Sequence, residues 1–276
     1  MTEQVERSGR FSRPRRLGQL LLSTLRKDRR RFETQSHAVE TPLRVASYNV
    51  HKCVGVDGRF NPERVAQVIA EISPDVIALQ EADKRFGERA GLLDLDWLHR
   101  NCGLIPVALN WDNKAHGFHG NVVLYKEGTV TRALQLHLPG VEPRGAVLVD
   151  LLLPHGHVRV VAAHLGLLRR SRAQQAKVIH SVARRHDGAP TILMGDFNEW
   201  RLGPRSALLE LSPLFGPLHS EVASFPGRFP VLSLDRILTS QPELLKRLEV
   251  HDSPLAKVAS DHLPVKAELE IPSQDE

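Results

Sequence analysis

Hydrophobic residues along the chain fall into short runs whose spacing separates strands from helices. The run Leu43–Asn49 alternates and ends on a polar residue, which predicts a strand. Asn61 and Pro62 then open a helix, because asparagine is a preferred N-cap and proline suits the first helical position. Apolar side chains recur on one face of this helix, at Val65, Val68, Ile69 and Ile72.

Further apolar runs predict more strands. Asp75–Leu79 is nearly continuous, as expected of a strand buried on both faces. The other expected strands are Asn121–Tyr125, Ala146–Leu153, Val158–Ala163, Thr191–Met194, Leu232–Leu238 and Val265–Ile271. Pro154–His157 has the composition of a hairpin turn, and Ser171–Arg185 has helical spacing. Its inward residues are expected to be Ala173, Ala176, Ile179, Val182 and Ala183. Hairpins mixed with strand-helix-strand units predict an α/β fold of packed sheets with helices outside.

Length and charge bound the organisation of the chain. Its 276 residues, 41% of them hydrophobic, suffice for one large domain, which we expect at 43–271. Residues 1–40 contain ten Lys/Arg and five Asp/Glu, whereas the remaining 27 basic and 27 acidic residues cancel. Because binding to nucleic-acid backbones needs basic residues clustered on the binding face, a basic excess confined to the tail is weak evidence for it.

The tail, residues 1–40, is expected to be flexible, since residues 1–16 are polar and rich in arginine. In residues 17–31, leucines at helical spacing precede a basic cluster, which fits a short amphipathic helix on an anionic membrane surface. A solvated charge run and an export signal remain alternatives, although no small-residue cleavage site follows.

The cysteines and the lengths of the apolar runs bear on localisation. Cys53 and Cys102 form no disulfide framework, so we expect free thiols in a reducing compartment. No run approaches the roughly eighteen apolar residues that a membrane-spanning helix needs. The expected location is cytoplasmic, with peripheral attachment to the inner face of the membrane as an alternative.

Acidic or amide side chains stand at or beside several expected strand ends. They are Asn49, Glu81, Asp196, Asp235 and Asp261, and Asp261 is followed by His262. Open α/β folds gather such positions at one edge of their sheets, and Mg²⁺ binds carboxylate and amide oxygens there. We expect Glu81 and Asp261 to be direct ligands, with Asn49 and Asp196 close by. This pattern favours a divalent-cation phosphoesterase.

Other catalytic motifs are missing from the sequence. There is no Gly-x-Ser-x-Gly elbow, and the contiguous Ser260-Asp261-His262 cannot converge as a folded triad. Phosphate-binding and dinucleotide-binding glycine motifs do not occur. Four loop histidines lack the frame of a zinc site; they are His116, His119, His155 and His157.

Eight separated motifs resemble the endonuclease/exonuclease/phosphatase superfamily, in that family's order. They are Ser-Tyr-Asn49-Val-His-Lys, Leu-Gln-Glu81, Gly120-Asn121-Val-Val-Leu, Pro143-Arg144-Gly145-Ala, Ala-His164-Leu, Gly195-Asp196-Phe-Asn198, Leu-Asp235-Arg-Ile and Ser260-Asp261-His262. The resemblance covers roughly residues 43–271 and implies a DNase I-like, four-layer α/β sandwich, with two packed mixed sheets flanked by helices. It also implies Mg²⁺-dependent phosphoester hydrolysis, in which Mn²⁺ can substitute.

The resemblance assigns roles to the acidic and amide residues. Glu81 would be the principal metal ligand, and Asn49 and Asp261 would complete or border that shell. Asp196 would orient and deprotonate the attacking water. Asn198 would hydrogen-bond the phosphoryl oxygens as negative charge develops on them.

The histidines and two further residues also receive roles by resemblance. His262 would contact the scissile phosphate, held in tautomer and orientation by Asp235. His164 would protonate the leaving oxygen, but no carboxylate partner for it is identifiable, so a structural role stays open. Arg144 would either hold a carboxylate or touch phosphate, and Asn121 is a candidate contact to the substrate phosphate.

The family does not fix the substrate, because its members act on DNA, RNA, inositol phosphates, sphingomyelin and nucleotide-linked groups. Specificity should lie in the loops around the site, at Lys84–Leu93, Trp111–His119, Arg201–Arg205 and Ser224–Val231. We expect a phosphodiesterase acting on nucleic acid or on a phospholipid or phosphorylated small molecule. Alternatives are an inositol-phosphate-type phosphomonoesterase and a catalytically silent scaffold. No protein partner is identifiable.

Overall fold

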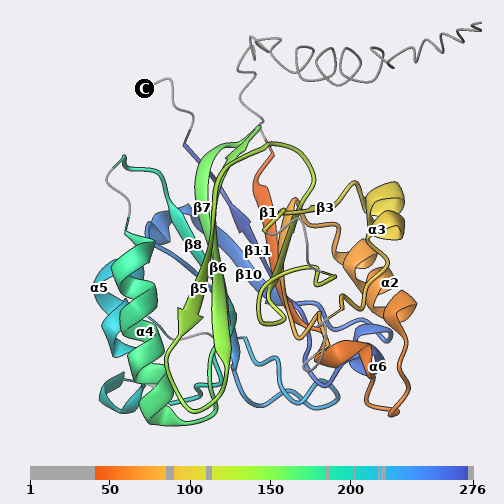
Figure 1. Ribbon diagram of the computed structural model, residues 1–276. Coiled ribbons are helices and arrows are strands. Elements are labelled where there is room, and N and C mark those ends of the chain that lie inside the picture. The colour runs from red at the N-terminus through yellow and green to blue at the C-terminus, as the bar shows by residue number, and fades with distance from the viewer. Residues whose placement is uncertain are drawn as a thin grey trace, which may run out of the picture. The chain divides into compact units, whose positions relative to one another are not determined.

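Two mixed β-sheets form the centre of the described structure (Figure 1). The computed structural model describes residues 41–84, 90–109, 114–184, 187–201, 203–216, 218 and 222–272. The first sheet has the strand order β10 (Leu245–Val250), β11 (Val265–Leu269), β1 (Leu43–Asn49), β2 (Val76–Gln80), β4 (Val122–Tyr125) and β3 (Ile105–Pro106). The second has the order β5 (Thr129–Leu138), β6 (Arg144–Leu153), β7 (Gly156–His164), β8 (Thr191–Asp196) and β9 (Asp235–Thr239).

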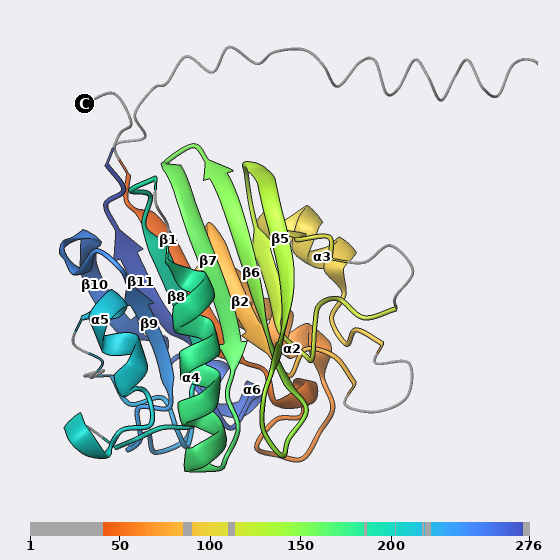
Figure 2. The same cartoon turned by 60° about the vertical axis from the view of Figure 1, so that its left-hand side comes forward.

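Helices cover the outer face of each sheet (Figures 1 and 2). The first sheet carries α2 (Pro62–Ile72), α3 (Leu95–Cys102) and α6 (Ala256–Ala259), and the second carries α4 (Arg169–Ala183) and α5 (Ser212–Phe215). Short 3-10 turns are η1 (His51–Cys53), η2 (Gly203–Arg205), η3 (Leu209–Leu211) and η4 (Pro242–Leu244). One apolar core lies between the sheets and one under each helical layer. The expected four-layer α/β sandwich is confirmed.

Local sequence signals account for these elements. The Asn61 side chain caps α2 by accepting a hydrogen bond from Arg64 N at 2.9 Å, with Pro62 at the first helical position. Alternation along β1 directs Val45 into the core between the sheets and Tyr48 toward the helices. The sheet therefore buries apolar side chains on both faces and presents its polar groups at the strand ends.

The topology brings distant parts of the chain to one edge of both sheets. β1 and β2 run parallel, as do β7 and β8, so these four strands end at that edge. Their antiparallel neighbours β4, β6, β9 and β11 begin there. His164, Asp196 and Asp235 are direct register partners on β7, β8 and β9. Sheet register alone thus aligns three of the expected catalytic residues.

Some sequence-based expectations need correction. The strand expected at Leu232–Leu238 begins only at Asp235, because Leu232 is bridged to Phe225 in the preceding loop. Asp235 therefore opens β9 and Asp261 precedes β11, so both lie where strands start at this shared edge rather than after strands that end there. The helix expected at Ser171–Arg185 runs from Arg169 to Ala183.

Two inward positions of that helix, Ala173 and Val182, are only half-buried, whereas Ala176, Ile179 and Ala183 are buried. The strands β5 and β10 and the helix α3 were not expected. The predictions for the tail, residues 1–40, and for Trp111 fall outside the described residues. No helix in the described part of the chain is long and apolar enough to cross a membrane.

Candidate active site

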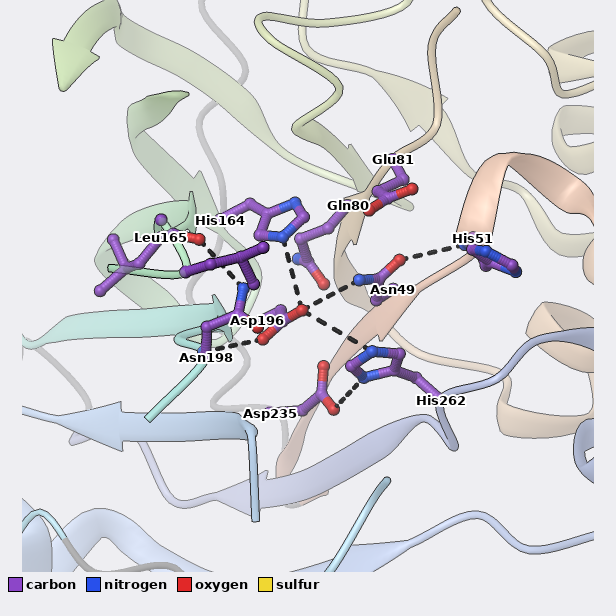
Figure 3. A network of polar contacts seen from close by, with 12 residues as sticks. Asn49, His51, Gln80, Glu81, His164, Leu165, Asp196, Asn198, Asp235 and His262 are labelled. Carbon is purple, nitrogen blue, oxygen red and sulfur yellow. Dashed lines mark hydrogen bonds and ion pairs between the residues drawn. The ribbon is translucent and has the colours of Figure 1, made fainter. Parts of the chain in front are cut away.

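Asp196, at the end of β8, lies at the centre of a buried polar network (Figure 3). Its Oδ2 accepts a hydrogen bond from Asn49 Nδ2 at 3.0 Å, which joins the two sheets. The same oxygen lies 3.5 Å from His164 Nε2 and 3.8 Å from His262 Nε2. One carboxylate oxygen therefore faces an amide and two imidazoles that come from three other strands or loops.

His262 is held by a second buried carboxylate. Its Nδ1 lies 2.7 Å from Asp235 Oδ2, which also accepts a hydrogen bond from Ser224 Oγ at 2.5 Å. Its backbone N–H donates to Ser260 Oγ, whose hydroxyl donates to the Asn49 carbonyl at 2.7 Å. With Nδ1 engaged by Asp235, Nε2 points toward Asp196 (Figure 3).

The two histidines differ in charge because their surroundings differ. Burial alone would lower the pKa of His262, but the charges of Asp235, Asp196 and Asp261 raise it to about 10. Burial lowers the pKa of His164 to about 4, against the opposing charge of Asp196. At neutral pH the site thus contains one imidazolium and one neutral imidazole.

Asn198 is positioned by its backbone as well as by its side chain. Its φ of 50° is left-handed, a conformation that asparagine tolerates better than most residues. The Asn198 N–H donates to Asp196 Oδ1 at 2.9 Å, and Nδ2 donates to the Leu165 carbonyl at 3.0 Å. The amide therefore stands next to Asp196, between the ends of β7 and β8.

The turn η1, directly after β1, is strained. His51, Lys52 and Cys53 have φ values of 45°, 55° and 59°, and such left-handed residues cost about 1–2 kcal/mol each. The strain places Lys52 Nζ 2.6 Å from Glu81 Oε2 and His51 Nδ1 3.7 Å from Asp261 Oδ1. The two expected metal ligands, Glu81 and Asp261, thus contact neighbouring residues of this one turn.

Glu81 itself has a left-handed φ of 56° immediately beyond β2. Burial would raise the pKa of its carboxyl, but His164 and Lys52 lower it below its ordinary value. The carboxylate is therefore ionised at neutral pH and already draws a cationic side chain to it. Strained backbone of this kind clusters at functional sites, where the surrounding fold sustains it.

Oxygen ligands of the hard-cation type occur on one side of this network. Glu81, Asp261 and the amide of Asn49 supply oxygens suited to Mg²⁺. Side-chain atoms of Asp196, Asp235 and His262 also lie within 4.8 Å of one another. The bond to Asp235 and the raised pKa leave the imidazolium of His262 no lone pair to offer a metal. The residues present therefore fit a divalent cation at Glu81, beside a proton-handling cluster.

Arg144, at the start of β6, pairs with a carboxylate that was not expected from the sequence. Its Nε and Nη2 donate to Glu142 Oε2 at 3.2 and 2.8 Å. Its Nη1 lies 3.0 Å from the His164 ring nitrogens. A pocket beside Glu81 is lined in part by Lys52, Lys84, His119, Arg144 and His164. Glu81, Asp83 and Glu142 line the same pocket, so Arg144 holds a carboxylate and also faces a pocket of mixed charge.

Asn121 takes a different place from the other expected residues. Its side chain is fully buried and Nδ2 donates to the carbonyls of Phe118 and Gly145. It clamps the loop before β4 to the start of β6, and direct contact with a substrate phosphate stays a prediction.

The remaining expected residues meet at the catalytic edge, although sequence analysis overlooked several of their partners. The Asn-Val-His-Lys motif offered a signal for Lys52, as did the Glu-Pro-Arg-Gly motif for Glu142. Ser224 carried no signal, since a serine in a loop has many ordinary explanations. The carboxylate nearest His164 is Asp196, which sequence analysis had assigned only to the water.

The four layers and the site at their shared edge define the DNase I-like class of α/β sandwich. The chain belongs to the Endonuclease/Exonuclease/phosphatase family, whose model matches residues 46–262. Members of this superfamily are hydrolases that act on phosphoesters, and they generally use divalent metals.

Known proteins resemble the chain along most of its length. A relative from Escherichia coli K12, the uncharacterized protein YbhP, is 28% identical in an alignment 250 residues long that covers 83% of this chain and 96% of the relative. A structure from Bacteroides vulgatus shares 19% identity and a TM-score of 0.64, covering 84% of this chain and all of its own. A mannosyl-6-phosphatase from Bacteroides thetaiotaomicron gives 19% and 0.62, covering 82% and 99%.

Zebrafish (D. rerio) TDP2 complexed with a single-strand DNA product gives 15% identity and a TM-score of 0.57, covering 82% of this chain and 98% of its own. At these identities the structural likeness establishes the fold.

Proposed function

We propose that the chain is a Mg²⁺-dependent phosphodiester hydrolase that activates water for attack on phosphorus, with Mn²⁺ able to substitute. The observation that carries this proposal is the network of Asn49, Asp196, His262 and Asp235 beside Glu81, in a chain of this family. Bound at Glu81, Asn49 and Asp261, the metal would polarise a phosphoryl oxygen as a Lewis acid.

The residues of the chain divide the reaction between them. Asp196 orients a water molecule and accepts its proton as the oxygen attacks phosphorus. The imidazolium of His262 and the amide of Asn198 donate hydrogen bonds to the phosphoryl oxygens, where negative charge grows. Asp235 keeps His262 charged and correctly turned. The bond from phosphorus to the leaving oxygen then breaks, and that oxygen takes up a proton.

His164 remains the candidate donor to the leaving oxygen. Because burial keeps its imidazole neutral, it has a single ring N–H, which can donate a hydrogen bond to the leaving oxygen, and the proton that this oxygen takes up then comes from water. Arg144 lies against the same ring and can neutralise the departing oxygen. Their positions support a shared role on the side of the site nearest β6 and β7.

A phosphomonoesterase is the second candidate, and the pocket beside Glu81 favours it. Lys52, Lys84 and Arg144 line this pocket together with Glu81, Asp83 and Glu142, and the three basic groups offer several hydrogen-bond donors to the oxygens of a monoester dianion. The similar solved structures include both a sugar phosphatase and a DNA-bound enzyme. Comparing bis-p-nitrophenyl phosphate with p-nitrophenyl phosphate separates the two candidates, since a diesterase prefers the former.

The test is metal-dependent turnover. Purified protein should cleave bis-p-nitrophenyl phosphate with Mg²⁺ or Mn²⁺, and EDTA should abolish the activity. Asp196→Asn should lower the rate by about 10²–10⁴-fold while leaving the circular dichroism spectrum unchanged. Turnover that persists in EDTA would contradict the mechanism, and a folded protein inactive on both ester types would favour a silent scaffold.

We also propose that the chain acts in the cytoplasm, where its two free thiols, Cys53 and Cys102, stay reduced. The two partners considered from the sequence are nucleic acid and an anionic membrane. Each would present a different kind of phosphoester to the site at the shared edge of the two sheets.

A further inference from the structure

Large hydrophobic side chains are exposed around the mouth of the site. Among the described residues, nine such side chains are exposed, and six of them lie on four loops at the catalytic edge. These six are Val141, Leu167, Leu168, Trp200, Phe229 and Val231. Val141 and Phe229 are 82% and 80% exposed, so nothing in the described structure covers them. Isolated exposed apolar residues are ordinary, but their gathering at one edge marks an interaction surface.

Hydrogen bonds tie these four loops to one another and to residues of the site. The described parts of the loops are 139–143, 165–170, 198–201 with 203–205, and 225–232, which together we call the rim. Leu167 N donates to Glu142 Oε1 at 2.7 Å, so the first two loops touch. Asn198 Nδ2 bonds the Leu165 carbonyl, and Gly227 N donates to the Asp261 carbonyl at 2.6 Å. These contacts place the rim beside the site, among the loops at the lower edge of Figure 1.

Positive charge alternates with these apolar side chains. Exposed arginines on the rim are Arg169, Arg170, Arg205 and Arg228. Arg169 Nε donates to the Arg205 carbonyl at 3.2 Å, and the Arg201 guanidinium stacks on the Trp200 ring at 4.5 Å. The acids within the described rim are Glu142 and Glu199, and both are already paired with arginines. The surface is thus apolar and cationic, with its few carboxylates neutralised.

We propose that the rim docks on an anionic phospholipid surface and that the substrate is a phosphoester in a lipid headgroup. The substrate half of this inference rests on the proposed hydrolytic function, whereas the docking half stands on the surface alone. The leucine, valine, tryptophan and phenylalanine side chains of the rim enter the headgroup and upper acyl region of the bilayer. The arginines of the rim contact lipid phosphates. Docking in this orientation presents headgroups directly to Glu81 and His262.

The composition of the rim favours lipid over the other partners that a cationic surface attracts. Single-stranded nucleic acid binds by stacking bases on aromatic rings, but four of the six exposed side chains are aliphatic. A protein docked on the rim would cover the entrance to the site that the rim borders. A bilayer satisfies the apolar and charged groups and supplies substrate through the same contact.

The docking half is tested by vesicle sedimentation with the full chain. Vesicles of phosphatidylglycerol and phosphatidylcholine in equal parts should pellet the protein, and pure phosphatidylcholine should pellet far less. The pair Leu167→Ser and Leu168→Ser, and separately Phe229→Ser, should each weaken partition by roughly tenfold or more. The tail, residues 1–40, is the same in every sample, so differences in partition between variants, measured where the original chain pellets only in part, report on the rim.

Leu152→Ser is the matched control. Leu152 is an exposed leucine on β6, near the hairpin at the end opposite Arg144, and its replacement should leave sedimentation unchanged. Equal pelleting of the rim variants, the control and the original chain would overturn the docking surface. Retention on single-stranded DNA instead of vesicles, lost in the same rim variants, would overturn it in favour of nucleic acid.

The substrate half is tested by release of water-soluble headgroup phosphate from the same vesicles with Mg²⁺. Vesicle binding without release, by a protein that cleaves bis-p-nitrophenyl phosphate, would overturn the lipid substrate and leave the hydrolase standing. Failure to cleave that soluble diester would refute the proposed function, while the sedimentation result would still decide the docking surface.

Discussion

Replacing Asp235 by asparagine removes the charge that holds His262 while keeping the size of the side chain. Asp235 is fully buried and lies 2.7 Å from His262 Nδ1, and it contributes most to the raised pKa of that imidazole. In Asp235→Asn, His262 loses both its fixed orientation and the main stabilisation of its positive charge. We expect kcat to fall, with a smaller change in KM.

The size of the effect follows from this hydrogen bond. A hydrogen bond to a charged group contributes about 1.5–3 kcal/mol. At about 1.36 kcal/mol per tenfold in rate, its loss from the transition state lowers kcat by roughly 10- to 160-fold. The Ser224 hydroxyl, which donates to Asp235, can keep donating to an amide oxygen or turn to accept from an amide N–H, so the fold should tolerate the change.

Steady-state cleavage of bis-p-nitrophenyl phosphate with Mg²⁺, normalised to the folded fraction from circular dichroism, measures this effect. Asp150→Asn is the matched control, because Asp150 is a buried aspartate paired with Arg159 at 2.7 Å, six residues along β6 from Arg144. At about 3.3 Å per residue it lies roughly 20 Å from the site. The control should lose stability but keep kcat per folded molecule. A decrease of less than about threefold in Asp235→Asn would refute the positioning role.

Three further predictions concern stability. Glu71, on α2, accepts hydrogen bonds from Ser253 and His251, which outweigh burial and lower the pKa of its carboxyl. Its stabilisation of the folded state is therefore present above the unfolded pKa and is lost as pH falls through the folded pKa. In urea titrations Glu71→Gln should cost about 0.5–1 kcal/mol at neutral pH and nothing in acid. Arg172→Met removes the buried cation paired with Glu199, which keeps only Arg201 at 3.6 Å and two backbone N–H donors, and it should lower the free energy of unfolding by about 3–5 kcal/mol. An unchanged denaturation midpoint would exclude this role of Arg172. Leu193→Ala, in the core under α4, should cost about 2–5 kcal/mol by calorimetry.

Buried central elements were predictable because their physics is local. The cap and stripe of α2 and the apolar runs of β1, β2 and β8 appear directly in the sequence. β5 and β10 were missed because their residues are mostly exposed or half-buried, so neither shows a clean apolar run. Strand register could not be predicted, since pairing is decided by packing between distant segments.

Site residues were predictable by type, but their partners were not. The structure brings Asn49, Asp196 and His262 together, as expected of polar residues at strand ends that share one edge, and their roles stay predictions. The contact of Lys52 with Glu81 depends on the left-handed turn after β1, and no propensity signals three such residues in a row. The exposed apolar surface of the rim likewise could not be predicted, because it forms only when four separate loops fold together.

The bond between Asn49 and Asp196 crosses from one sheet to the other, so the candidate site is assembled from two layers that side-chain packing and a few polar contacts keep in alignment. A slip of about 1 Å between the layers would break this bond while leaving every strand ladder intact. Enzymatic activity should accordingly fall on heating before the circular dichroism signal of the sheets changes. In this chain, loss of activity would report a shift between the two sheets earlier than loss of secondary structure does.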